Sequence, residues 1–122
     1  MAQRLADAGY VVFVPDLFYR YGAYGPLVPA EVFAGDVAAI LGPLMASTGN
    51  SIATEDTAPI LSCVDPRSDV KGTKIGPIGF CLGGGMAIAP AGTYPDTVPA
   101  GASFPGGGTD NAAPGSPPPH RP

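Results

Sequence analysis

The sequence predicts an α/β fold in which parallel strands alternate with flanking helices, followed by a disordered tail rich in glycine and proline. Two short apolar runs, Tyr10–Pro15 and Thr73–Phe80, are typical of strands buried on both faces of a parallel sheet. The amphipathic segment Ala30–Met45 lies between them, and this order predicts βαβ units. The chain holds 18 glycines and 16 prolines among 122 residues, well above the usual share, and its periodicity ends near the C-terminus. We therefore expect one domain over residues 1–104 and a low-complexity tail over residues 105–122.

The first 29 residues are expected to form a helix, a strand and a loop. Ala2–Ala8 has a helical apolar face and stops at Gly9, a residue type that favours helix C-termini. Tyr10–Pro15 forms the strand, and Asp16–Pro29 forms an aromatic-rich loop. The tyrosines of this loop are Tyr19, Tyr21 and Tyr24. They either line a pocket for an apolar substrate or pack on the surface of the loop.

Two helices are expected in the middle of the chain. The first, Ala30–Met45, is expected to kink or end early at Gly42-Pro43. Its apolar face consists of Phe33, Val37, Ile40, Leu41 and Leu44. The second is expected to be capped by Thr54 and to run to Val64. Cys63 lies on this second helix among apolar residues, which predicts a small core side chain.

The remaining elements are a strand, a helix and a strand. Thr73–Phe80 is the strand, weakened by Pro77 because proline cannot donate to a β-ladder. The helix Gly83–Ala91 contains Pro90, which costs about 3 kcal/mol or more inside a helix. Ala100–Phe104 is expected to be a third strand.

Charge and cysteine usage exclude several classes of protein. The net charge is −4 and no basic cluster is present, which argues against nucleic acid and anionic membrane surfaces as partners. No apolar run is long enough to span a bilayer, and the N-terminus lacks a signal-peptide pattern, so a cytoplasmic location is expected. Cys63, Cys81 and His120 are too few for a zinc site, and neither a metal nor a cofactor is expected.

The segment with the clearest chemical signal is Gly-Phe-Cys-Leu-Gly-Gly-Gly, residues 79–85. It follows an apolar strand and opens a helix, which is the context of the nucleophile elbow, here with Cys81 in place of serine. Such a turn pushes the nucleophile out above the sheet, and glycines at 79 and 83 supply room where strand and helix crowd together. A helix N-terminus favours a thiolate over a thiol, and the backbone N–H of Leu82 would point at a developing oxyanion.

Two other interpretations of residues 79–85 are a structural turn and a dinucleotide-binding turn. A glycine-rich turn between a strand and a helix can also hold a buried, inert cysteine. A dinucleotide-binding turn needs the spacing G-x-G-x-x-G, and no such register fits here.

The residues around this turn resemble the dienelactone hydrolase family of the α/β-hydrolases. The resemblance rests on Gly79–Gly85, on the preceding Lys-Gly-Thr-Lys-Ile-Gly, and on the stretch Ala6–Phe18 with its Val-Pro-Asp-Leu-Phe letters. It covers residues 1–104 in the same order and spacing. The fold it implies is a partial α/β-hydrolase fold, incomplete at both ends.

The resemblance implies hydrolysis of a lactone or carboxylic ester in a small molecule, with a cysteine nucleophile, a histidine base and an orienting aspartate. Cys81 matches the nucleophile, Leu82 the oxyanion N–H, and Gly79, Gly83 and Gly84 the elbow glycines. In a separate segment, Arg20 matches a position that can bind a substrate carboxylate, with a solvated loop arginine as the alternative. Asp16 is structural in the family's pattern.

The family's remaining triad members are not identified in this sequence. Only Asp96 and Asp110 are acids after the elbow, and His120, the one histidine, lies between Pro119 and Arg121. We therefore expect an incomplete or inactive copy of the enzyme. A non-catalytic remnant that needs a partner, or a thiol redox sensor that uses Cys81, are the alternatives. The oligomeric state is left open.

Overall fold

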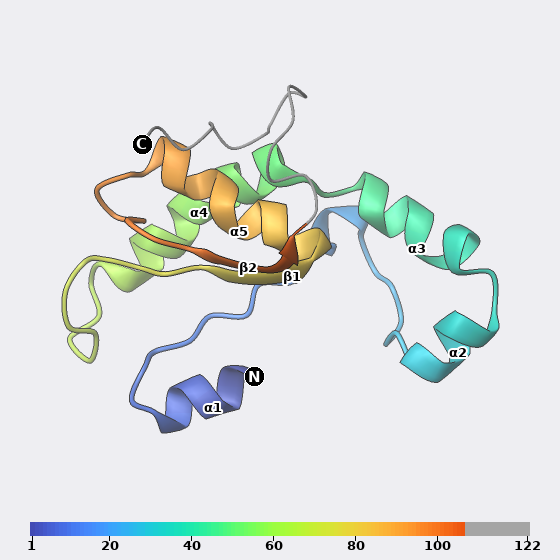
Figure 1. Cartoon of the computed structure of the whole chain (residues 1–122), viewed down its shortest axis with the longest axis horizontal. Helices are drawn as coiled ribbons and strands as arrows, with labels where there is room; N and C mark the ends of the chain where they lie inside the picture. Colours follow the sequence, from blue (N-terminus) through green and yellow to red (C-terminus); the bar gives the residue numbers. More distant parts are fainter. Residues whose placement is uncertain (107–122) are drawn as a thin grey trace. The chain divides into compact units, whose positions relative to one another are not determined.

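The computed structural model describes residues 1–106, and Figure 1 shows their helices and strands. The chain divides into two compact units. The first unit is Met1–Ser47, and the second begins at Thr48. Most of the predicted tail, residues 107–122, lies outside the described residues, while Pro105 and Gly106 belong to the last strand.

The first unit contains three α-helices and one turn of 3-10 helix. They are α1 (Ala2–Asp7), η1 (Tyr19–Tyr21), α2 (Pro29–Ala34) and α3 (Val37–Ala46). The predicted end of α1 is confirmed: Gly9 has φ +92°, its N–H donates to Ala6, and the N–H of Tyr10 donates to Leu5. This is the Schellman arrangement that glycine favours.

The predicted strand Tyr10–Pro15 is wrong, because this segment forms no strand in the structure. Its side chains are largely exposed, 68% for Tyr10 and 75% for Val14. The segment has the composition of a strand, but a strand also needs a neighbour to complete its hydrogen bonds. Within Met1–Ser47 no strand is present to supply them.

The predicted helix Ala30–Met45 is divided into α2 and α3, and the break lies at Gly35 and Asp36 rather than at Gly42-Pro43. The Asp36 carboxylate accepts from the N–H of Ala39 at 3.0 Å and so caps a new helix. The break changes which side chains are covered. Val32 and Leu44 are buried, whereas Phe33, expected on the apolar face, is 73% exposed.

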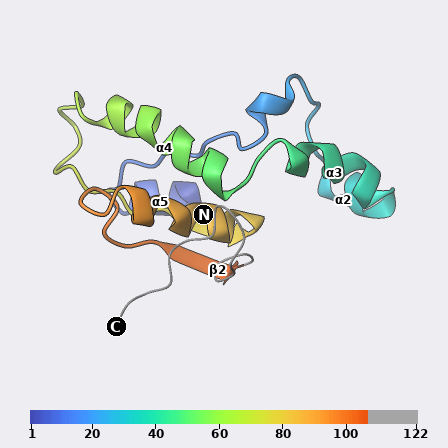
Figure 2. The same ribbon diagram turned by 90° about the horizontal axis from the view of Figure 1, so that it is seen from above.

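The second unit is a small parallel sheet covered by helices, consistent with a partial α/β fold. Its elements are α4 (Asn50–Val64), β1 (Ile78–Cys81), α5 (Leu82–Thr93) and β2 (Ala102–Gly106). α5 packs on both strands and on α4, and Figures 1 and 2 show α4 and α5 side by side. The buried residues here are Thr57, Val64, Gly79, Gly84, Gly85, Met86, Ala87, Ala89, Pro90 and Val98.

Two expectations for α4 are wrong. The helix begins at Asn50, and the hydroxyl of Thr54 donates to the Asn50 carbonyl at 2.8 Å instead of capping the N-terminus. Cys63 is exposed rather than part of the core. The buried residues of α4 are Thr57 and Val64, seven positions apart, and Cys63 lies off that stripe.

The two strands confirm the predicted parallel pairing, with shifted bounds. β1 starts at Ile78, directly after Pro77, so the proline precedes the strand instead of interrupting it. Residues Ile78, Gly79 and Phe80 pair with Ala102, Ser103 and Phe104 in turn, and Cys81 then pairs with Gly106. This register irregularity leaves out Pro105, the residue without an N–H.

Proline also occurs inside three helices: Pro43 in α3, Pro59 in α4 and Pro90 in α5. Each helix continues past its proline for three residues or more. Among residues 1–106, no helix is long and apolar enough to cross a membrane.

Candidate functional site: a cysteine at a strand–helix turn

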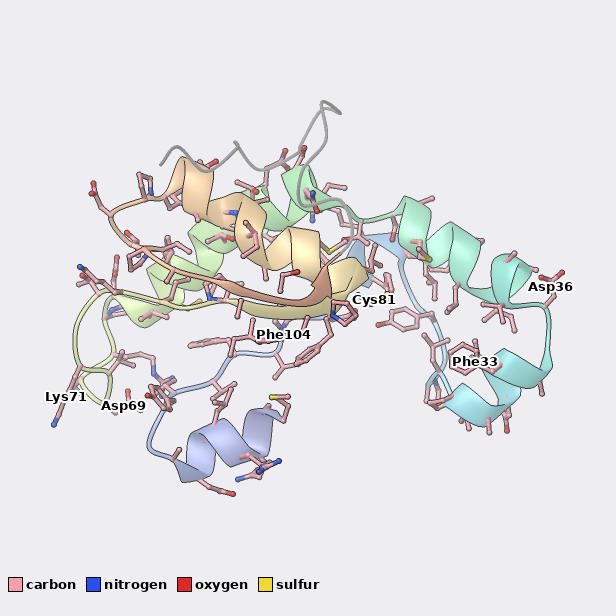
Figure 3. All side chains as sticks on the ribbon, in the orientation of Figure 1. Phe33, Asp36, Asp69, Lys71, Cys81 and Phe104 are labelled. Carbon is pink, nitrogen blue, oxygen red and sulfur yellow. The ribbon has the colours of Figure 1, made fainter. Side chains whose placement is uncertain are left out.

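Cys81 lies at the junction between β1 and α5, as the last residue of the strand and the N-cap of the helix. Its backbone has φ +51° and ψ −116°, and it is the one non-glycine residue of residues 1–106 with positive φ. Such a conformation is costly for a residue with a Cβ and occurs preferentially at functional sites. The side chain is exposed at the end of the sheet (Figure 3).

Gly79 explains how strand and helix approach closely enough to form this turn. A Cβ added at Gly79 would overlap the carbonyl of Gly83 and would lie 2.9 Å from the Cβ of Ala87. The close approach therefore requires glycine at this position. Gly83 differs from expectation, because a Cβ there would meet no atom within 4 Å. It contributes its backbone to the contact and needs no space for a side chain of its own.

Gly84 and Gly85 are both buried in the first turns of α5. The first five residues of α5 are Leu82, Gly83, Gly84, Gly85 and Met86, and none of them is charged. The helix N-terminus therefore carries no acidic side chain. The N–H groups of the first turn have no partner within the helix. The Leu82 N–H, immediately after Cys81, is one of them.

Beside the turn lies an aromatic pair that the sequence analysis did not single out. The rings of Phe80 and Phe104 stack with centroids 5.7 Å apart and an angle of 28° between their planes. Figure 3 shows Phe104 on the side of the sheet away from α5, and both residues are about half exposed. The signal was available in the strand register, since the two positions are opposite each other.

Arg20 lies in the first unit, in η1, with its guanidinium carbon 4.9 Å from the centroid of the Tyr19 ring. Tyr19 and Tyr21 are about half exposed. The loop around them is organised by Asp16, whose Oδ1 accepts from the N–H of Phe18 at 2.9 Å and from the hydroxyl of Tyr24 at 2.6 Å. This agrees with a structural role for Asp16.

Tyr24 is held between two of its loop neighbours. Its ring meets that of Phe18 edge-on, with centroids 5.9 Å apart. The hydrogen bond to Asp16 raises the pKa of Tyr24, with added contributions from desolvation and from the negative charge of Asp16. The phenol therefore acts here as a donor that fixes the loop.

The rest of a hydrolytic triad is not located by the structure. Asp96 is exposed in the segment after α5, while Asp110 and His120 lie outside the described residues. Within residues 1–106, no group of three or more histidine, cysteine or acidic side chains could hold a metal ion.

The comparisons with known proteins agree with the geometry of the turn. The family model described as "Dienelactone hydrolase family" matches residues 1–120. No curated protein and no solved structure matches the chain. Because the family model spans nearly the whole sequence, the chain belongs to the dienelactone hydrolase family, and a hydrolase-like function follows at this general level.

Proposed function

We propose that this protein transfers the acyl group of a small lactone or carboxylic ester to Cys81. The observation that carries the proposal is the positive φ of an exposed cysteine at the start of α5. Strain of this kind persists only where the surrounding structure enforces it. Here the close contact between β1 and α5 enforces it, and that contact requires glycine at position 79.

In the proposed reaction, the Cys81 thiolate attacks the carbonyl carbon and the carbonyl electron pair moves onto oxygen. The N–H of Leu82 donates to that oxyanion, and the partial positive charge of the α5 N-terminus stabilises it. The tetrahedral intermediate then breaks its bond to the alcohol oxygen, which leaves as an alkoxide, and a thioester remains on Cys81. Attack by water on the thioester releases the carboxylic acid and returns the thiol.

The two half-reactions have different requirements. An activated ester with a good leaving group needs no proton donor, so acylation needs only the thiolate and the oxyanion donor. Activation of water needs a general base, and residues 1–106 contain no histidine. We expect acylation by an activated ester to be faster than deacylation, because only deacylation needs an activated water, so that the thioester accumulates.

Arg20 is proposed as a group that binds a carboxylate on the substrate. Its planar guanidinium suits a two-point contact with a carboxylate. Its guanidinium carbon lies 4.9 Å from the centroid of the Tyr19 ring. The test of this role compares the acylation rate of an ester that carries a distal carboxylate with that of an ester that lacks it. Both rates are measured in the native chain and in Arg20→Gln.

The test of the main proposal is the reaction with p-nitrophenyl acetate. We expect a burst of about one p-nitrophenolate per chain, followed by slow release, and one acetyl group found on Cys81 by peptide mass spectrometry. Cys81→Ala should lose both the burst and the adduct. Cys63→Ser is the matched control, since Cys63 is also exposed but lies on a regular helix. Equal labelling of both cysteines, or a burst that survives Cys81→Ala, would contradict the proposal.

A further inference from the structure

Cys81 forms a turn of a single residue. It is the last residue of β1 and the N-cap of α5, so the chain passes from strand to helix within one residue. Because the peptide groups on both sides are planar, its φ of +51° is set by where Phe80 and Leu82 are held. The contacts that hold these two neighbours lie within the second unit, and they differ in kind.

The helix side of the turn is held by packing. α5 contacts both strands and α4, and its buried residues include Met86 and Ala87. The close approach of Gly79 to the Gly83 carbonyl also holds the first turn of the helix against β1. Leu82, the first residue of α5, therefore moves only if these contacts break.

The strand side of the turn is less well covered. Phe80 is 47% exposed, and the pairing of β1 with β2 is regular only as far as this residue. The register shifts between Phe80 and Cys81, so Phe80 and Phe104 form the last regular pair before the irregularity. Local opening is easiest where regular pairing ends. A contact that holds Phe80 at this position therefore has a direct effect on the residue that follows it.

The stacked rings supply such a contact. The centroids of Phe80 and Phe104 lie 5.7 Å apart with 28° between the ring planes, a geometry in which aromatic rings attract each other. Phe104 lies on the side of the sheet away from α5, as Figure 3 shows. The contact between Gly79 and Gly83 lies on the α5 side. Two successive residues before Cys81 are thus held from opposite faces of the sheet.

We propose that Phe104 is a positioning residue for Cys81. Through its stack with Phe80, it holds the end of β1 so that Cys81 keeps its left-handed conformation and its thiol stays in place relative to the Leu82 N–H. The effect on the backbone is measurable without any reaction. The consequence for acylation rests on the proposed function.

The backbone effect is tested by the strain at position 81. The difference in urea unfolding midpoint between Cys81→Gly and Cys81→Ala is measured with and without Phe104→Leu. We expect Phe104→Leu to reduce this difference to about half or less, because a released strand end no longer enforces positive φ. Phe80→Leu should have the same effect, and the two substitutions together should have no further effect. Phe104→Tyr, which keeps the ring, should retain the full difference. Ile78→Ala, a change in the same strand outside the stack, should retain it too.

The effect on the reaction is tested by two reagents. Acylation by p-nitrophenyl acetate uses the thiolate and the Leu82 N–H, whereas alkylation by iodoacetamide uses the thiolate alone. We expect Phe104→Leu to lower the acylation rate about tenfold and to leave the alkylation rate of Cys81 unchanged. The pH profile of acylation should keep its midpoint while its plateau falls, and Phe104→Tyr should restore the plateau.

The outcomes separate this proposal from the proposed function. A midpoint difference that Phe104→Leu leaves unchanged, or that Ile78→Ala reduces equally, would overturn the positioning role. An equal fall in acylation and alkylation would also overturn it, because general damage to the site has that effect. A native chain without an acylation burst, but with a midpoint difference that depends on the ring at Phe104, would contradict the proposed function and support the positioning role.

Discussion

Gly79 on β1 and Gly83 on α5 approach so closely that a methyl group on Gly79 would overlap the Gly83 carbonyl, while a methyl group on Gly83 would meet nothing. Two glycines of one motif thus have different physical tasks. Gly79 sets the distance between strand and helix. Gly83 provides only the backbone that Gly79 approaches.

This difference predicts opposite effects of the same substitution. Gly79→Ala forces β1 and α5 apart and should destabilise the protein by about 1–3 kcal/mol or more. Gly83→Ala is the matched control, because alanine in a helix is favoured over glycine by about 0.8–1 kcal/mol and the space is open. Urea unfolding followed by circular dichroism measures both. A Gly79→Ala variant as stable as the native chain would show that the contact does not constrain the turn.

The backbone of Cys81 should store measurable strain. Cys81→Gly is expected to be more stable than Cys81→Ala by about 1–2 kcal/mol, because only glycine adopts φ +51° without a steric cost. The same pair of substitutions at Cys63, inside α4, should give the opposite order, since glycine costs about 1 kcal/mol relative to alanine in a helix. The measurement is the midpoint of thermal or urea unfolding of the four variants, with Gly and Ala at position 81 and at position 63. The same order at both positions would argue against strain at Cys81.

The Asp36 cap should determine whether α3 begins where it does. Asp36→Ala removes the acceptor for the Ala39 N–H and should cost about 0.5–2 kcal/mol. Asp36→Asn keeps a capping oxygen and should cost little. Helix content by circular dichroism and the unfolding midpoint are the measurements. An Asn variant as damaged as the Ala variant would indicate that the charge, and not the cap, is needed.

The hydrogen bond between Tyr24 and Asp16 predicts a pH dependence at the alkaline end. The pKa of Tyr24 is raised in the folded chain, so the neutral phenol is favoured by folding. Its stabilising contribution is fully present below the unfolded pKa of about 10 and is lost as the pH rises through the folded value. Difference absorbance of tyrosinate between the native chain and Tyr24→Phe reports this titration.

Asp16→Asn supplies the control for that titration. It removes the negative charge that opposes a tyrosinate and weakens the acceptor, so the pKa of Tyr24 should fall toward its ordinary value. A titration of Tyr24 that is identical in Asp16→Asn would contradict the assigned cause.

The sequence predicted the second unit better than the first, and particular residues show why. The elbow motif is a local constraint: the glycine at 79, the cysteine at 81 and the following helix are contiguous, so their geometry is encoded in one short segment. The strand at Tyr10–Pro15 depends on a neighbour from elsewhere in the chain, and composition cannot report whether that neighbour exists. The structure shows that within Met1–Ser47 it does not.

The break between α2 and α3 has a signal in the sequence that the prediction of one helix over Ala30–Met45 did not use. Gly35 followed by Asp36 is a helix stop followed by a helix start, and both residues act in this way. Gly42-Pro43 suggested a stronger interruption, yet α3 continues through it because one missing hydrogen bond can be tolerated in an exposed helix. The partners of Cys81 in a complete triad could not be predicted, because the candidates Asp110 and His120 lie in the segment without periodicity.

The prolines inside α3, α4 and α5 have a consequence for how these helices open. Each lacks the N–H that would donate to the carbonyl four residues earlier, so the series of backbone hydrogen bonds in each helix is weakened at that turn. Helix propagation owes its cooperativity to an unbroken series of such bonds. We therefore expect amide hydrogen exchange in these helices to be fastest in the turns that contain Pro43, Pro59 and Pro90.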